Sequence, residues 1–83
     1  MPKILEWHGC RFFSYANEGT PLEPCHIHVR KGACEAKFWI DPDVALVSSY
    51  GFSSQELNDL QDVIDDQEQL IRRKWNDFFQ HRS

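Results

Sequence analysis

Apolar and polar side chains alternate through two stretches in the middle of the chain, residues 25–31 and 34–40. Because successive side chains of a strand point to opposite faces of a sheet, this alternation predicts two strands. The glycine at position 32 lies between them, which indicates a β-hairpin. One face of this hairpin is apolar and is expected in the core: Ile27, Val29, Cys34, Ala36, Phe38 and Ile40. The other face is expected to meet solvent: His26, His28, Arg30, Glu35, Lys37 and Trp39.

An earlier pair of strands is predicted over residues 3–8 and 11–16, with a turn at Gly9. Both faces of this first hairpin are partly apolar, so the pattern does not say which one is buried. A glycine and two prolines mark residues 17–24 as a loop. Residues 44–48 form either a short fifth strand or a loose connection. In the second hairpin, the predicted register sets Arg30 opposite Glu35 and His26 opposite Trp39.

From residue 54 to about residue 80, apolar side chains recur with the period of an α-helix. Ser53 and Glu56 have the spacing of a capping box, which marks the start of the helix. A single helix of this length is about 40 Å long, more than a small sheet covers. Either its end projects toward a partner, or the helix breaks near Asp65 and Asp66. The unbroken apolar stripe favours one helix. The stripe consists of Leu57, Leu60, Val63, Ile64, Leu70, Ile71, Trp75, Phe78 and Phe79.

Together these elements predict a single α+β domain over residues 1–83. An antiparallel meander of four or five strands forms one layer, and one long C-terminal helix packs on one face of it. The chain has 83 residues, of which 41% are hydrophobic, enough for one small two-layer core. No apolar run approaches the ~20 residues of a membrane span, and no signal peptide is evident. We therefore expect a cytoplasmic protein that does not bind membranes.

Cysteine usage and charge exclude several classes of protein. Three cysteines without a CxxC pair argue against a disulfide framework and against a four-thiolate zinc site, so we expect reduced thiols and no cofactor. The net charge of −4 is unevenly placed. Residues 1–42 hold five basic and five acidic side chains, whereas residues 43–83 hold four and eight. A globally basic, nucleic-acid-binding composition is therefore absent, although a local basic patch is compatible with these numbers.

The two imidazoles on the polar face are the main candidates for chemistry. His26 and His28 are two residues apart on one strand and must project from the same face. As an acid–base pair beside cationic side chains, they would suit cleavage of RNA or phosphoryl transfer. As part of a binding face, they would suit single-stranded nucleic acid or another phosphate-bearing ligand. The residues of that face are Arg11, Tyr15, His26, His28, Arg30, Lys37 and Trp39.

Two further interpretations of the histidines stay open. As ligands of a transition metal they have suitable spacing, and His8 or a thiolate would complete the site. However, Cys25 and Cys34 project from the opposite face of the hairpin, so we assign no metal ligands. The alternative without function is a solvated sheet face on which the histidines pack against Trp39.

The end of the predicted helix is unusually aromatic. Trp75, Phe78 and Phe79 either close the core or form a docking surface for a partner protein or a second copy of the chain. The basic residues beside them, at positions 72–74, complement the negative end of the helix dipole. We assign the three aromatic residues to partner binding.

An ordered set of motifs resembles the family described as domain of unknown function 4160. The motifs are PCHIHV at 24–29, EAKFWIDP at 35–42, GFS at 51–53 with EL at 56–57, and a tryptophan at 75 with FF at 78–79. The resemblance implies no established activity. It implies small prokaryotic proteins that are often encoded beside another small protein, in pairs that look like toxin–antitoxin or regulatory modules. Cys25 stands where the family usually has a second proline, so the family lends it no role.

We therefore expect a small cytoplasmic binding or regulatory module, one member of a toxin–antitoxin-like pair, with a partner protein encoded nearby. RNA or another phosphate-bearing ligand is the expected small partner. The alternatives are a metal-independent, ribonuclease-like toxin that uses His26 and His28, and a transition-metal-binding protein. The sequence does not predict the oligomeric state.

Overall fold

The computed structural model describes residues 3–14 and 24–80, and describes residues 78–80 by their backbone only. Five strands are followed by two helices. The strands are β1 (Lys3–Trp7), β2 (Cys10–Phe13), β3 (His26–Lys31), β4 (Cys34–Trp39) and β5 (Ala45–Tyr50). The helices are α1 (Ser54–Asp66) and α2 (Glu68–Gln80).

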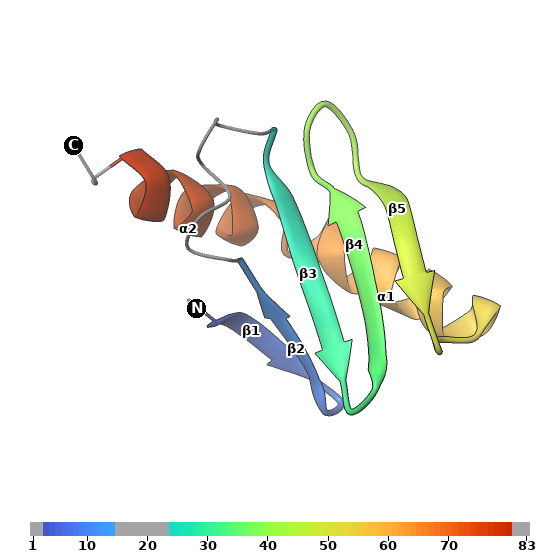
Figure 1. Ribbon diagram of the computed structural model, residues 1–83. Coiled ribbons are helices and arrows are strands. Elements are labelled where there is room, and N and C mark those ends of the chain that lie inside the picture. The colour runs from blue at the N-terminus through green and yellow to red at the C-terminus, as the bar shows by residue number, and fades with distance from the viewer. Residues whose placement is uncertain (1–2, 15–23, 81–83) are drawn as a thin grey trace.

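The strands form one antiparallel sheet in the order β1-β2-β3-β4-β5, which is the predicted meander (Figure 1). Arg30 lies opposite Glu35 and His26 lies opposite Trp39, as the register predicted. The segment after residue 44 is a fifth strand, although it covers residues 45–50 rather than 44–48. β2 ends at Phe13, short of the predicted residue 16, and residues 15 and 16 lie outside the described part of the chain.

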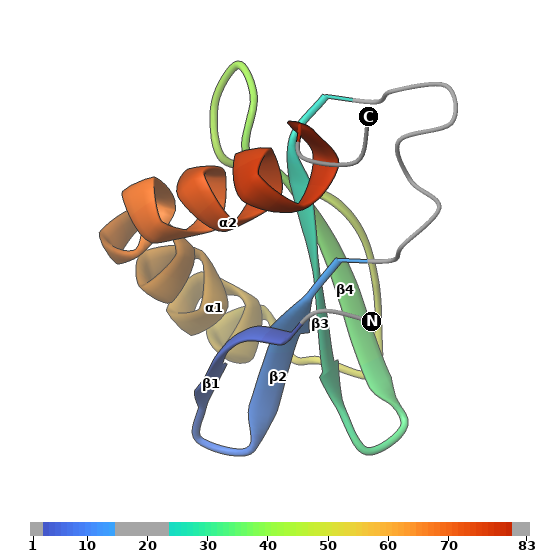
Figure 2. The ribbon, with the colours of Figure 1, turned by 90° about the vertical axis from the view of Figure 1, so that its left-hand side faces the viewer.

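Both helices lie on the same face of the sheet (Figure 2). The alternation of the second hairpin explains this arrangement, because its apolar face is the face that the helices cover. Ile27 and Phe38 are completely buried there, together with Leu60 and Ile64 of α1 and Ile71 of α2. Phe12 brings β2 into the same core. The buried face of the first hairpin, which the pattern left open, is thus the one that carries Cys10 and Phe12.

The C-terminal segment is two helices, so the prediction of one long helix is wrong. The chain leaves helical geometry at Gln67, where φ is −107° and ψ is 17°. Asp65 and Asp66 favour a break at this place, because carboxylates are unfavourable at the negative end of α1 and favourable just before the positive end of α2. The break lets each helix lie on a small sheet that an unbroken 40 Å helix would overrun. No helix in the described part of the chain is long and apolar enough to span a membrane.

Local signals set the start of α1 as predicted. The Ser53 hydroxyl accepts a hydrogen bond from the Glu56 backbone N–H (3.1 Å), and the Ser53 N–H donates to the Glu56 carboxylate (2.8 Å). Just before this capping box, Gly51 turns the chain out of β5 with a φ of +85°. A Cβ atom at Gly51 would lie 2.9 Å from the Cys34 Sγ, so the turn requires glycine for conformation and for space.

Candidate ligand-binding face

The polar face of the second hairpin continues onto its neighbouring strands as one surface, which we call the open face. It is the face of the sheet turned away from the helices, and Figure 1 is seen from its side, with α1 passing behind β4 and β5. The antiparallel register sets its side chains in rows across the strands. The first row is Glu6, Arg11, Arg30, Glu35 and Tyr50. The second row is Lys3, Phe13, His28, Lys37 and Ser48.

A small cationic hollow lies at the β1–β2–β3 side of the open face. Lys3, Arg11, Phe13 and Arg30 line it, and its volume is about 140 Å³. Arg11 lies directly opposite Arg30 on the neighbouring strand, an arrangement that is unfavourable for two like charges. Glu35 offsets part of this repulsion through an ion pair with Arg30 (3.0 Å), and Glu6 pairs with Lys3 (2.9 Å). Arg11 is exposed and makes no ion pair with the described residues.

Lys3 controls the charge of the nearest carboxylate. The hydrogen bond and the positive charge of Lys3 hold the pKa of Glu6 below its usual value, and the charge of Arg11 adds to this effect. Glu6 is therefore ionised at neutral pH. Four cations of the open face (Lys3, Arg11, Arg30 and Lys37) thus stand against two carboxylates, Glu6 and Glu35. The open face is cationic although the whole chain is acidic.

A second hollow, of about 300 Å³, lies beside the first on the open face. Phe13 lines both hollows, so they adjoin at its ring. His28 stacks on Phe13 with a centroid distance of 5.7 Å and an interplanar angle of 24°. The polar and aromatic lining includes His28, Glu35, Lys37, Ser48 and Tyr50. Phe13 itself is only 7% exposed, so the aromatic surface open to a ligand comes from the half-buried His28 and the exposed Tyr50. Aromatic rings beside cations suit a ligand that has both a flat ring and a phosphate.

His26 does not meet solvent, and the expectation that it lies on a solvated face is wrong. Its side chain is completely buried. The ring lies between Trp39 of β4 and Trp75 of α2, at centroid distances of 5.5 and 5.0 Å. Its Nδ1 lies 2.9 Å from the Pro24 carbonyl oxygen, and because a carbonyl only accepts, Nδ1 carries the proton. The alternation of the strand assigned His26 to the correct face, but α2 reaches that end of β3 and covers it.

The two histidines touch, but they differ in access. The rings of His26 and His28 meet edge to face with centroids 5.3 Å apart. His28 is half-buried and lines the larger hollow, whereas His26 is sealed behind it. A ligand on the open face would therefore contact one imidazole and not two.

The remaining predicted site residues divide into three groups. Arg30 and Arg11 lie at the cationic hollow, and Lys37 places its ammonium 4.8 Å from the centroid of the Trp39 ring. Trp75, assigned to partner binding, is 5% exposed and packs in the core, which is the other role that the sequence left open for it. Tyr15 and the side chains of Phe78 and Phe79 lie outside the described part of the chain.

The described cysteines and carboxylates do not gather into a metal site. Among the residues that the structure describes, no three His, Cys, Asp or Glu side chains come together in a group that suits a metal ion. Burial raises the pKa of Cys10 and raises that of Cys25 to about 12. Both thiols are therefore protonated at neutral pH, and neither is a ready ligand or nucleophile.

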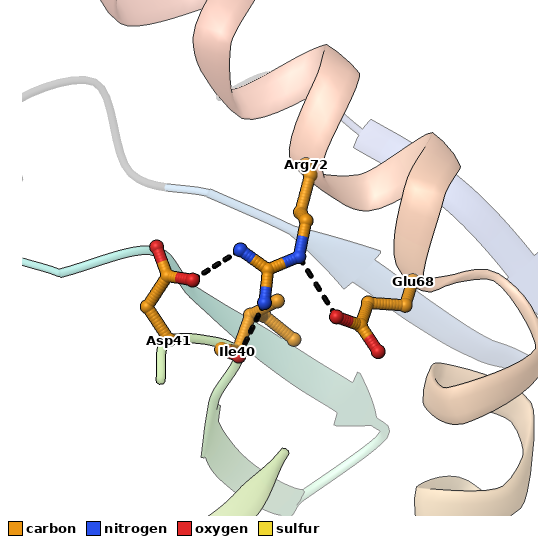
Figure 3. Close-up of polar contacts among 4 residues, drawn as sticks. All are labelled: Ile40, Asp41, Glu68 and Arg72. Carbon is orange, nitrogen blue, oxygen red and sulfur yellow. Dashed lines mark hydrogen bonds and ion pairs between the residues drawn. The ribbon is translucent and has the colours of Figure 1, made fainter. Parts of the chain in front are cut away.

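A polar cluster that the sequence pattern did not reveal joins α2 to the end of β4 (Figure 3). Arg72 forms an ion pair with Asp41, donates through Nε to Glu68 (2.8 Å), and donates through Nη2 to the Ile40 carbonyl oxygen (3.0 Å). The spacing of Glu68 and Arg72 on one helix is visible in the sequence. Asp41 lies 31 residues away, and nothing local indicates that it completes the cluster.

The comparisons with known proteins agree with the motifs. The family model described as domain of unknown function (DUF4160) matches residues 9–76, which is most of the chain. The chain therefore belongs to this family. No curated protein and no solved structure matches it. The family description assigns no biochemical role.

Proposed function

We propose that this member of the DUF4160 family is a binding module that holds single-stranded RNA on its open face. The observation that supports the proposal is the pair of adjoining hollows, one lined by three cations and the other by His28, Lys37 and Tyr50. In this arrangement a phosphate sits in the hollow of Lys3, Arg11 and Arg30. The neighbouring base packs beside His28 and Tyr50, which both line the larger hollow. Stacking on aromatic side chains and neutralisation of phosphates are the two main sources of affinity for single strands.

The acidic net charge of the chain is compatible with this proposal, because many of the carboxylates lie in the helix layer and not on the open face. α1 carries five carboxylates, at Glu56, Asp59, Asp62, Asp65 and Asp66, and α1 lies on the other side of the sheet. Charges more than a Debye length of about 8 Å apart are largely screened at physiological salt. A strand of RNA on the open face therefore meets mainly the cations of that face.

The geometry favours binding over cleavage. General acid–base cleavage needs two groups within reach of the reacting atoms. His26 is buried between two indole rings, so the two imidazoles cannot act together on a ligand in the larger hollow, which only His28 lines. Binding needs no second imidazole, and the cations that it needs are exposed.

Fluorescence anisotropy with a labelled single-stranded RNA of about ten nucleotides tests the proposal. Arg11→Ala and Arg30→Ala should each weaken binding roughly tenfold, because each removes a charge-assisted contact to phosphate. Arg73→Ala is the matched control, since Arg73 is an exposed arginine on α2, in the helix layer. It should leave the affinity within about twofold of the original.

The salt dependence of binding gives a second readout. Each phosphate contact on a single strand contributes a slope of about −0.7 to a plot of log affinity against log salt concentration. Loss of Arg11 or Arg30 should make that slope shallower by about this amount. An original protein that does not bind RNA at about 100 µM contradicts the proposal. So does an Arg11→Ala variant that binds no worse than Arg73→Ala.

A further inference from the structure

We infer that β5 is an edge through which two copies of this chain pair, antiparallel and about a two-fold axis, to continue the sheet from one copy into the other. This inference is independent of the proposed function. It concerns the margin of the sheet, which Figure 1 shows opposite β1, and not the open face.

The first observation is the lack of protection along β5. All six residues of Ala45–Tyr50 are exposed, including Leu46 (43%), Val47 (41%) and Tyr50 (72%). In the described part of the chain β5 pairs with β4 alone, so the backbone groups on its outer side have no strand partner. Natural sheets protect such edges with charged side chains, prolines or covering segments. β5 contains no charged residue and no proline.

The opposite edge of the same sheet is protected. β1 carries Lys3 and Glu6, both exposed and joined in an ion pair, at positions where an added strand would approach. Its apolar residues Ile4, Leu5 and Trp7 are half-buried against the core. Of the two edges of the described sheet, β5 is therefore the one without protection.

Charge selects a second copy in the antiparallel orientation as the occupant. β5 is neutral, so two copies do not repel each other along the strand. The nearest charge before the strand is Asp43, and the residues that follow the strand are the uncharged Gly51 and Phe52. Antiparallel pairing sets each Asp43 beside the neutral end of the other copy, whereas parallel pairing would set the two carboxylates together. A two-fold pair also closes, because it uses the β5 edge of both copies at once and leaves that edge with no further strand to bind.

The pairing should be weak. A standard stable interface buries about 1,600 Å², and an edge of six residues buries less than this. The register of β5 against β4 also shifts between Lys37 and Phe38, and the extra residue, Val47, twists the strand and shortens its flat part. We therefore expect a dissociation constant in the micromolar to millimolar range.

Sedimentation equilibrium from about 10 µM to about 1 mM, the range where such a constant is measurable, tests the inference. The original protein should shift from monomer to dimer across this range. Hydrogen exchange at the two extremes should show protection gained at amides of residues 45–50. Val47→Lys should weaken dimerisation at least roughly tenfold, because an ammonium on an edge strand opposes pairing. Asn58→Lys adds the same charge to an exposed position of α1 and should dimerise like the original.

Circular dichroism shows whether the two variants keep the fold, and Leu46→Lys replaces Val47→Lys if the latter unfolds. A protein that stays monomeric at about 1 mM overturns the inference. A dimer that survives both edge substitutions, or one whose formation leaves the exchange of residues 45–50 unchanged, overturns it as well.

Discussion

At the scale of single residues, burial of Cys25 should make the free energy of unfolding fall at alkaline pH. Burial, followed by the charge of Asp41, raises the pKa of its thiol from 9.0 to about 12. Above pH 9 the unfolded chain loses this proton while the folded chain keeps it, so stability falls as pH rises toward 12. Cys25→Val should flatten this part of the decline. Urea denaturation between about pH 8 and pH 11 measures the effect, because the protonation of Cys25 differs between the folded and unfolded states in this range.

The half-buried Cys34 provides the control for that measurement. The rest of the chain contributes equally to every variant, so only the difference between the curves reports on Cys25. If the Cys25→Val and Cys34→Val proteins lose stability in parallel with the original, desolvation of Cys25 does not contribute to the alkaline limit.

His26 illustrates how far the sequence predicts a single site residue. Its position in an alternating strand predicted its face and its partner Trp39, and both are correct. Its burial depends on Trp75, which lies 49 positions later in the chain and packs against the ring. Strand alternation reports where a side chain points and not what covers it. Arg30 is exposed on the predicted polar face, because no described element covers that end of β3.

At the scale of elements, Arg72 fastens α2 to the sheet, and its removal should loosen that contact. Its guanidinium bonds two carboxylates and a backbone carbonyl at once, so Arg72→Met should lower the free energy of unfolding by about 1–2 kcal/mol. Arg72→Lys should recover little of this, because an ammonium lacks the planar fork. Urea denaturation of Arg73→Met supplies the control, with an expected change within about 0.5 kcal/mol. Equal losses in Arg72→Met and Arg73→Met would show that the cluster adds no stability.

The helix break shows why the elements were predicted less completely than the strands. The helical spacing of apolar residues continues on both sides of the break at Gln67, because both helices bury their apolar faces against one sheet. Periodicity therefore reported one helix. Asp65 and Asp66 instead favour a break, because their negative charges lie at the negative end of α1. The strands had clearer limits, since glycines at 9, 32 and 51 turn the chain with positive φ angles.

At the scale of the whole molecule, positive and negative side chains lie in different layers, which the net charge of the chain does not show. The halves of the sequence indicated an acidic C-terminal part, and the fold places the five carboxylates of α1 on one side of the sheet. The cations of the open face come from β1, β2, β3 and β4, and only the register brings them together. The meander could be predicted from alternation. The adjoining hollows could not, because they depend on which side chains of four strands become neighbours.

Pairing through β5 has a consequence for RNA binding if both proposals hold. Tyr50 and Ser48 of β5 line the larger hollow, so two copies joined at this strand bring their two hollows to either side of one seam. An RNA long enough to cross the seam binds both copies, and the second contact gains from a high effective concentration. We expect an RNA of about 20 nucleotides to bind at least roughly tenfold more tightly than one of about 8 nucleotides. Anisotropy titrations of the original protein and of Val47→Lys measure this preference. A longer RNA also offers more overlapping binding sites, but this statistical gain is the same for both proteins. The comparison between them therefore isolates the effect of pairing. The same length preference in both would mean that each copy binds RNA alone.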